Sequence, residues 1–463
     1  MRRSEAHVGG RPHHAAPETL DVVGVGFGPT NLALAIAIEE HNAGVPAPAR
    51  LRAAFLERQE RFGWHRGMLL EGATMQVSYL KDLVTLRNPA SNFSFLSYLH
   101  GCDRLVDFIN HKTMFPLRHE FHDYLEWAAG RLDHLVEYGQ EVTTLRPVVE
   151  DGEIRYIDVV SRSVDDPSML LVRRARNVVL ALGLTPSVPE GFTLGDRVWH
   201  NGDLLDRLEQ LPSTPHGRFL VVGAGQSGAE VTDYLHRTFP AAEVHAVFAR
   251  YGYSPADNSP FANQIFDPDA VDDFFQASPD VRRMLTGYHR STNYSVVDLD
   301  LIEELYRRSY QEKVRGPRRL HLRRASRVTE LEPLPEGIRA TVEFLPTGER
   351  RALDADVVVL ATGYHARDPR LLLGEFAELC RQDADGRPLV SRDYQVVTAE
   401  PASAGVYTPG ATEHTHGISS TLLSNVAIRS GEILDSILAR AVGDEAGGMT
   451  GRVPAQPLVA AGR

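Results

Sequence analysis

The sequence predicts an α/β fold, because one strand–turn–helix unit occurs twice and a further apolar strand follows each copy. In the first copy, an apolar strand beginning at Leu20 runs into Gly24, Gly26 and Gly28. Pro29 then stands where a third glycine is usual, and an apolar helical stretch follows over 31–40. A tight turn of this kind leaves free backbone N–H groups at a helix start, where they can bind a pyrophosphate.

The second copy is a complete Gly-x-Gly-x-x-Gly turn. The strand 219–222 runs into Gly223 and Gly225, Gln226 and Ser227 follow, and Gly228 opens a helical stretch. Two turns of this kind, each framed by a strand and a helix, are far more specific than one. The sequence therefore predicts two Rossmann-like dinucleotide-binding domains.

The strand after each turn indicates which nucleotide is bound. After the first turn, the apolar strand 53–56 ends in Glu57, whose carboxylate suits the hydroxyls of a ribose. After the second, the strand 244–248 is followed by Ala249 and Arg250, and a cation there suits a 2′-phosphate. We therefore expect FAD at the first site and NADPH at the second.

The composition excludes several other classes of protein. The 463 residues are 43% hydrophobic and 24% charged, which is ordinary for a globular protein of more than one domain. A net charge of −12 argues against a nucleic-acid partner, and no apolar run is long enough to cross a membrane. The two cysteines, Cys102 and Cys380, are far apart, which fits a reducing cytoplasm and excludes a dithiol redox centre.

The order of these segments suggests how the domains are arranged. We expect an FAD-binding domain formed by 19–205 and 345–440, and an NADPH-binding domain over 206–344. The stretch at about 251–309 lacks strand periodicity and is expected to form a smaller, mainly helical substrate-binding region. We expect 1–18 and 441–463 to be disordered tails.

Several longer motifs carry a family resemblance. The segments 75–83, 257–266 and 293–298, with 414–417 and 421–424 near the end, occur in an order and at separations typical of one family. They resemble the flavin-dependent N-hydroxylating monooxygenases of siderophore and natural-product pathways, and within them the L-ornithine N-monooxygenases. The resemblance implies that NADPH reduces FAD, and that a flavin hydroperoxide formed with O2 hydroxylates the δ-amine of L-ornithine. It also implies a homotetramer.

Lys81, Asn263 and Asn293 are the candidate residues for binding the substrate. Lys81 is one of only three lysines and lies in an apolar frame, so a buried ammonium that binds an amino-acid carboxylate is expected. Asparagine amides both donate and accept, which suits the zwitterionic head of the same ligand. The resemblance implies that these three residues bind ornithine, and that Leu422 and Ser424 belong to the segment that closes over the reacting side chain.

The resemblance also implies roles around the two cofactors. Gln76 corresponds to a glutamine near the flavin and the nicotinamide, and Arg118 to an arginine that contacts the nicotinamide and helps flavin reduction. Tyr294 is placed to stack on the nicotinamide nucleotide. Trp64 and His65 either pack against the flavin or serve the core.

Some assignments depart from the family or stay open. Arg250 lies one position after the family's phosphate-binding arginine, where this chain has Ala249, so nicotinamide use is better founded than NADPH preference. His414 and His416 have no set of further ligands, and no metal is expected. The substrate could also be lysine, a diamine or another amino acid. An NADPH oxidase or reductase without an organic substrate, or a non-catalytic FAD-binding protein, are further alternatives.

Overall fold

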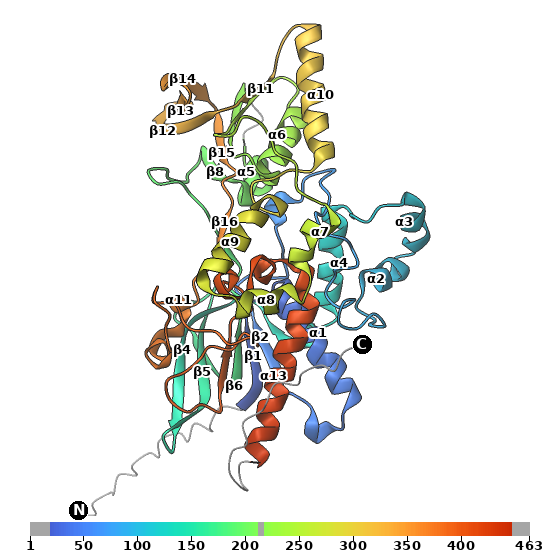
Figure 1. The fold of residues 1–463 in the computed structure, drawn as a ribbon, viewed down its shortest axis with the longest axis vertical. Coiled ribbons are helices and arrows are strands. Elements are labelled where there is room, and N and C mark those ends of the chain that lie inside the picture. The colour runs from blue at the N-terminus through green and yellow to red at the C-terminus, as the bar shows by residue number, and fades with distance from the viewer. Residues whose placement is uncertain (1–18, 212–216, 447–463) are drawn as a thin grey trace, which may run out of the picture.

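The computed structural model describes residues 19–211 and 217–446 (Figure 1). The expected tail 1–18 and the end of the chain from residue 447 lie outside this range. The expected start of the second tail is wrong, since the last helix continues through Ala446. Within the described ranges, no helix combines the length and the apolar character needed to cross a membrane.

The first unit is built on a seven-stranded mixed sheet with the order β3-β2-β1-β6-β5-β4, in which β17 also pairs with β6. The strand that carries the first glycine turn is central and parallel to both neighbours, so its carboxyl end opens at the middle of the sheet. The strands are β1 (Thr19–Val25), β2 (Ala53–Leu56), β3 (Val136–Glu137), β4 (Gln140–Glu150), β5 (Glu153–Ser163), β6 (Leu170–Leu180) and β17 (Gly405–Tyr407).

The second unit is built on a five-stranded parallel sheet with the order β11-β10-β9-β15-β8. A three-stranded antiparallel sheet adjoins it, and a two-stranded ribbon, β16 with β7, completes the set. The strands are β7 (Leu184–Pro186), β8 (Val198–His200), β9 (Arg218–Val222), β10 (Glu243–Val247), β11 (Leu320–Arg323), β12 (Ser326–Leu334), β13 (Gly337–Phe344), β14 (Glu349–Ala355), β15 (Val357–Leu360) and β16 (Tyr364–Ala366).

The helices cover the two sheets and fill the region between them (Figure 1). α1 and α13 lie side by side, and their apolar side chains join those of β1, β2 and β6 in the largest core cluster. The helices are α1 (Pro29–Gly44), α2 (Phe95–Gly101), α3 (Leu105–His111), α4 (Arg118–Gly130), α5 (Leu204–Glu209), α6 (Gln226–Thr238), α7 (Pro260–Asn263), α8 (Ala270–Gln276), α9 (Pro279–His289), α10 (Leu299–Arg315), α11 (Arg370–Leu373), α12 (Glu413–His416) and α13 (Val426–Ala446).

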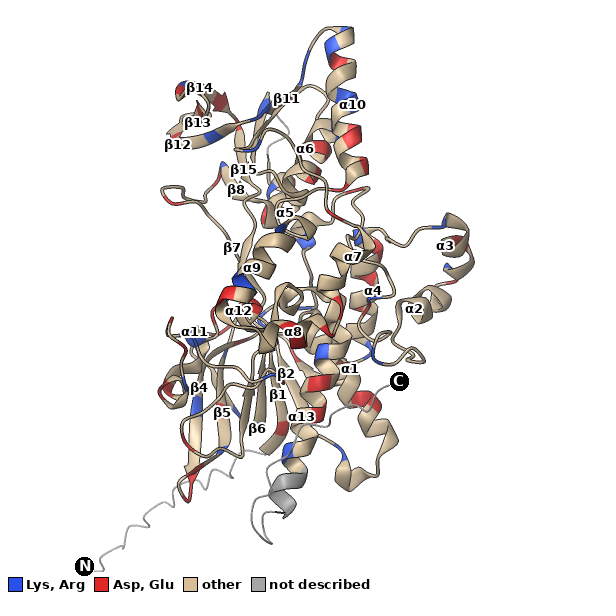
Figure 2. Ribbon diagram, in the orientation of Figure 1, with Lys and Arg blue, Asp and Glu red and all other residues tan. Residues whose placement is uncertain are grey.

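The expected α/β architecture is confirmed, with corrections at the boundaries of the units. The stretch 251–309 is helical, since α7, α8, α9 and most of α10 fall within it. However, β15 and β8 pair in the second sheet, although 345–440 and 19–205 were assigned to the first unit. The apolar run of β15 suits a central parallel strand of either sheet, so its sequence alone does not say which. Basic and acidic residues follow one another along α10 (Figure 2).

Candidate functional site

The first glycine turn has the form of a nucleotide cradle. A Cβ on Gly24 would lie 2.2 Å from the Phe55 ring, and one on Gly26, where φ is +82°, would lie 2.5 Å from the Ala181 carbonyl oxygen. The fold itself requires these two glycines. A Cβ on Gly28 would meet nothing within 4 Å, although Gly28 precedes Pro29 at the start of α1. That open space at a helix N-terminus is where a pyrophosphate would sit.

Glu57 lies at the end of β2, beside the same turn. Its Oε2 accepts from the Phe27 backbone N–H at 2.7 Å, and its Oε1 accepts from the Gln59 N–H at 2.9 Å. Each carboxylate oxygen can accept a second hydrogen bond. The ribose hydroxyls of a dinucleotide on this turn therefore have a fixed and buried acceptor.

Several buried polar atoms without partners are available to the rest of the cofactor. In the described part of the chain, Thr412 Oγ1, Ser420 Oγ and both side-chain polar atoms of Asn425 are buried and make no hydrogen bond. Such atoms are costly unless a ligand or water completes them. They lie on the segment that leads into α13, and α13 contacts α1 near the first glycine turn, where Ser430 Oγ donates to the Thr30 carbonyl. The residues present fit FAD.

Trp64 and His65 follow the Glu57 strand but do different things. Trp64 is half-buried and packs against the large core cluster, with its ring 6.2 Å from that of Phe121. His65 has a left-handed backbone with φ at 48°, and its ring lies 4.9 Å from that of Trp64 and 6.0 Å from that of Tyr364. Burial of the ring, with Arg118 nearby, lowers the pKa of His65 to about 4. Trp64 therefore packs on the core, whereas the imidazole of His65 is a neutral group near Arg118 and Tyr364.

The second glycine turn approaches the helical insertion. A Cβ on Gly223, where φ is +144°, would lie 2.1 Å from the Ala361 carbonyl oxygen, and one on Gly228 would lie 2.7 Å from the Gly223 oxygen. A Cβ on Gly225 would come within 3.4 Å of Ser295 Cα. Ser227, the second residue of α6, is half-exposed. A nucleotide at this turn would therefore lie between α6 and the insertion.

Arg250 and Tyr294 border this second site. Arg250 follows β10, and its Nη1 donates to the Ser295 carbonyl at 2.8 Å. The Tyr294 hydroxyl donates to Glu413, and the guanidinium of Arg290 lies 5.7 Å from the Tyr294 ring centre. Burial, reinforced by Glu413, raises the pKa of Tyr294 well above its ordinary value. Tyr294 is thus held as a neutral donor.

Gln76 and Arg118 are brought to the second turn by two carboxylates that the sequence analysis did not assign. Arg118 pairs with Glu230 on α6, and Gln76 Nε2 donates to Asp298 Oδ2 at 2.5 Å. The sequence does contain a signal for Glu230. A carboxylate one turn into a pyrophosphate-binding helix would repel the bound anion, so its presence indicates a cationic partner that neutralises it.

Residues adjacent to the candidate substrate-binding residues pack against one another, and this brings their segments together. Ile265, Tyr294 and Ile418 share one apolar cluster with Phe274, so the segments of Asn263, Asn293 and the 418–424 stretch meet there. The Lys81 segment reaches the insertion through Gln76 and Asp298. Asn263, Asn293 and Leu422 are half-buried, and Ser424 is buried.

Lys81 differs from its expected state. The side chain is half-buried, not buried, since the segment around it is an irregular chain of turns in place of a packed strand or helix. Within the described residues its ammonium has no hydrogen-bond or ion-pair partner. A cation without a partner, five residues after Gln76, is available to a carboxylate ligand.

One His/Glu cluster lies away from these sites. Glu243, His245 and His321 place ligand atoms within 4.8 Å of one another in β10 and β11. However, Arg218 donates to Glu243 Oε2 at 3.0 Å and Arg323 to His245 Nδ1 at 3.1 Å. Two arginines therefore already bind atoms that a metal ion would need as ligands.

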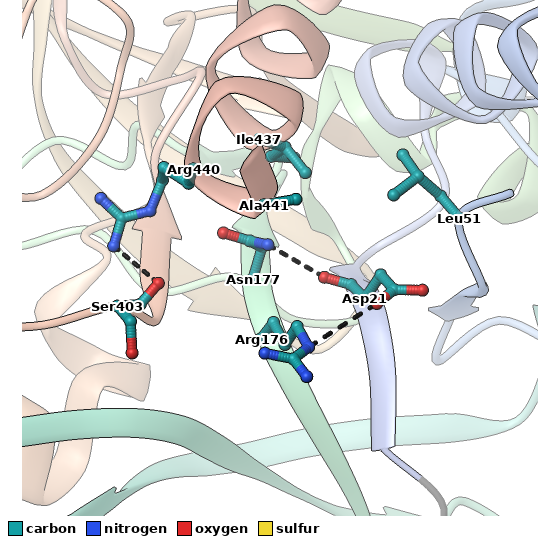
Figure 3. Close-up of a pocket in the computed structure, with 8 residues that line it drawn as sticks. All are labelled: Asp21, Leu51, Arg176, Asn177, Ser403, Ile437, Arg440 and Ala441. Atoms are coloured by element: carbon teal, nitrogen blue, oxygen red, sulfur yellow. Dashed lines mark hydrogen bonds and ion pairs between the residues drawn. The ribbon is translucent and has the colours of Figure 1, made fainter. Parts of the chain in front are cut away.

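A small pocket lies at the amino end of β1, remote from the glycine turn at the other end of that strand (Figure 3). Asp21, Arg176 and Arg440 line it, and Asn177 Nδ2 donates to the Asp21 carbonyl at 3.1 Å. Arg440 donates to three successive carbonyls, at residues 402–404. The polar groups that line the pocket are bonded within the protein, and the pocket lies at the opposite end of β1 from the glycine turn. It is therefore separate from the nucleotide sites.

Comparison with known proteins identifies the family of the chain. A family model described as L-lysine 6-monooxygenase/L-ornithine 5-monooxygenase matches residues 18–366. The L-ornithine N(5)-monooxygenase of Pseudomonas aeruginosa is 38% identical over 422 residues, which cover 90% of this chain and 93% of that protein.

Solved structures are similar over most of the chain. The ornithine N-hydroxylase KtzI of Kutzneria sp. 744, described with reduced FAD, NADP+ and L-ornithine, has a TM-score of 0.87 and 48% identity. The match covers 92% of this chain and all of that one. The L-lysine 6-monooxygenase of Pseudomonas syringae has a TM-score of 0.79 and 33% identity, over 91% of this chain and 99% of its own. This chain belongs to the L-lysine 6-monooxygenase/L-ornithine 5-monooxygenase family.

Proposed function

We propose that the chain hydroxylates the δ-amine of L-ornithine with O2, using FAD at the first glycine turn and NADPH at the second. The observation that carries the choice of an amino-acid substrate is the ammonium of Lys81, five residues after Gln76, which has no partner in the part of the chain that the structure describes. Relatives and solved structures named for ornithine support ornithine over lysine. The product would enter siderophore or other natural-product biosynthesis.

In this proposal the protein binds and orients, and bound FAD supplies the activation of oxygen. Lys81 holds the substrate carboxylate, and the amides of Asn263 and Asn293 hold its α-amino and carboxyl groups. Leu422 and Ser424 cover the reacting end and exclude water. Arg118 and Gln76 hold the nicotinamide. Because the head group is fixed, the length of the side chain decides whether the amine reaches the reacting oxygen.

The test compares NADPH oxidation with hydroxylamine formation for ornithine, lysine and putrescine at saturating oxygen. The proposal predicts one hydroxylamine per NADPH with ornithine alone. Lysine is expected to bind but to release peroxide, since one methylene costs only about 1–3 kcal/mol of binding and its main effect is misplacement. Coupled hydroxylation of lysine or putrescine would reassign the substrate. Peroxide alone with all three would indicate an NADPH oxidase.

We further propose that the chain works as a homotetramer in the cytoplasm. Exposed apolar side chains of and near α3, Val106, Ile109 and Phe115, support a self-association surface. Light scattering during size-exclusion chromatography measures the assembly, and a monomeric mass at micromolar concentration would contradict it. Cell fractionation tests the location.

A further inference from the structure

A continuous set of polar contacts crosses from the FAD unit to the second nucleotide-binding unit. On the FAD side are Gln76 and Arg118, the first residue of α4. On the other side are Gln226 and Glu230 of α6, and Asp298 immediately before α10. The five residues lie on four segments that are more than 40 residues apart in the sequence, so only the fold brings them together. Three of these segments lie in or immediately before α4, α6 and α10, which are labelled in Figure 1.

Arg118 and Glu230 form a two-point ion pair. Arg118 Nη1 donates to Glu230 Oε2 at 2.8 Å, and Nη2 donates to Oε1 at 2.6 Å. The side chains are only 12% and 6% exposed. The guanidinium also donates to the carbonyls of Met68 and Thr74, at 3.1 and 3.3 Å. A planar group held at both nitrogens by a carboxylate has little freedom to rotate.

Asp298 forms the second branch of the set. Its Oδ2 accepts from Gln76 Nε2 at 2.5 Å and from Gln226 Nε2 at 3.4 Å. Gln226 Oε1 accepts from the Asp298 backbone N–H at 2.9 Å, and Gln226 Nε2 also donates to Glu230 Oε1 at 3.0 Å. Gln226, the first residue of the pyrophosphate-binding helix, thus joins the two carboxylates that hold Gln76 and Arg118.

The charges explain why this pairing is needed. A carboxylate in the second turn of α6 would repel the pyrophosphate expected at the start of that helix. Among the described residues, Arg118 is the one cation within ion-pair distance of Glu230 and neutralises it. Conversely, an Arg118 without Glu230 would be drawn to the remaining anions near it, which are the Asp298 carboxylate and the bound dinucleotide. The ion pair with Glu230 therefore fixes the position of the Arg118 guanidinium.

We propose that Glu230 is a positioning residue, which holds Arg118 for flavin reduction and keeps it from collapsing onto the bound dinucleotide. Asp298 likewise holds the side chain of Gln76 in position. The inference rests on the proposed role of Arg118 at the nicotinamide. Glu230 itself touches neither cofactor in this scheme and acts through Arg118.

The direct test measures the rate of FAD reduction by NADPH without oxygen, together with NADP+ affinity by calorimetry, in Glu230→Gln. We expect the reduction rate to fall about tenfold or more, since small displacements of a positioning group have effects of this size. NADP+ affinity is expected to stay equal or to rise, because the freed guanidinium gains an anion. Glu303→Gln, at an exposed site on α10, is the matched control and should change neither.

A double-mutant cycle shows whether Glu230 acts through Arg118. In an Arg118→Met background, Glu230→Gln is expected to slow reduction no further. Glu230→Asp, which keeps the charge but is one methylene shorter, should show part of the loss and serves if the glutamine variant does not fold. Unchanged reduction in Glu230→Gln, or equal losses with and without Arg118, would overturn the proposal.

The thermal midpoint and bound FAD separate a structural effect from a positioning effect. If reduction, NADP+ affinity and thermal midpoint all decline in parallel, Glu230 is merely structural and the inference fails. Reduction is measured without an amino acid, so the result is independent of the ornithine assignment. A wild-type chain that oxidises NADPH but hydroxylates no ornithine would defeat the proposed function and leave this inference standing.

Discussion

The backbone N–H of Phe27 donates to Oε2 of Glu57 at 2.7 Å, which joins the middle of the first glycine turn to the end of the neighbouring strand. Glu57 is 7% exposed, and its other oxygen accepts from the Gln59 N–H. One carboxylate therefore shapes the glycine turn and keeps further acceptor capacity, which we expect the ribose to use. We thus expect the structure of the turn and the binding of FAD to depend on the same charge.

Glu57→Gln is expected to weaken FAD binding about tenfold or more, because a hydrogen bond to a charged acceptor contributes about 1.5–3 kcal/mol. The amide keeps one acceptor and the size of the side chain, so the fold should persist. The measurement is the dissociation constant of FAD by fluorescence titration of the apoprotein. Glu60→Gln, at an exposed position nearby, is the control. Unaltered FAD affinity in Glu57→Gln would refute the assignment of the first turn.

The two glycines Gly26 and Gly28 are expected to respond differently to alanine. Gly26→Ala places a Cβ 2.5 Å from a carbonyl oxygen at positive φ, so the thermal midpoint of the apoprotein should fall by several degrees. Gly28→Ala meets no protein atom within 4 Å, so the apoprotein should be as stable as wild type but bind FAD poorly. Differential scanning fluorimetry with and without FAD measures both. A Gly28→Ala protein that binds FAD normally would place the pyrophosphate elsewhere.

The local elements were predictable, while contacts between the units were not. The strand 53–56 was predicted with the bounds that the structure has, since its apolar run is short and ends at a charged residue. The membership of β15 was predicted wrongly, because a buried apolar strand carries no mark of its sheet. Glu230 and Asp298 escaped assignment for a similar reason. Each acts through a partner on a distant segment. The place of Glu230 in its helix indicates a cationic partner, but no local pattern shows that this partner is Arg118 or that Asp298 binds Gln76.

Lys81 shows the limit of reasoning from neighbours. Apolar residues around it suggested burial, but the segment is irregular and the side chain stays half-exposed. Lys81→Met is still expected to raise KM for ornithine by about tenfold or more through loss of the charge on the carboxylate. Reduction of FAD by NADPH without substrate should be unaffected. Steady-state hydroxylamine formation and anaerobic reduction measure the two effects. Lys313→Met is the control, and an equal KM in both variants would refute the role of Lys81.

Stability should depend on pH through His416. It is fully buried, stacked on Tyr394 with ring centres 4.4 Å apart, and burial lowers its pKa from 6.5 to about 4. Between these values the unfolded chain binds a proton that the folded chain does not. The contribution of neutral His416 to the free energy of unfolding is therefore complete above pH 6.5. It is lost as the pH falls toward 4, by up to about 3 kcal/mol.

Urea denaturation of wild type and His416→Gln at pH 7 and pH 5 isolates this contribution. The variant should lose less stability than wild type between the two pH values, since it has no proton to take up at this position. His365→Gln, at an exposed histidine, should keep the wild-type difference. If the free energy of unfolding of His416→Gln fell as much between pH 7 and pH 5 as that of wild type, His416 would not be the source of the pH dependence.

Preference for NADPH over NADH is expected to depend on two arginines at the ends of neighbouring parallel strands. Arg250 follows β10, and its carbonyl accepts from the Ala325 N–H at 2.7 Å, which places Arg324, just after β11, beside it. The Arg324 guanidinium lies 4.2 Å from the ring centre of Tyr251. In the described structure neither arginine has a carboxylate within ion-pair distance. Ligands of such sheets bind at these strand ends, so we expect the pair to face the 2′-phosphate.

Arg250→Ala and Arg324→Ala should each lower the ratio of kcat/KM for NADPH to that for NADH by about tenfold or more, and the double variant should lower it further. The effect should be confined to NADPH, since NADH lacks the phosphate. Calorimetry with 2′,5′-ADP measures the same contact without turnover, and Arg315→Ala, at an exposed helix end, is the control. If Arg250→Ala alone abolishes the preference and Arg324→Ala leaves it intact, a single arginine reads the phosphate despite its shift by one position. Loss of NADPH and NADH activity in equal measure would mean that the two arginines support the fold of this edge and not the recognition of the nucleotide.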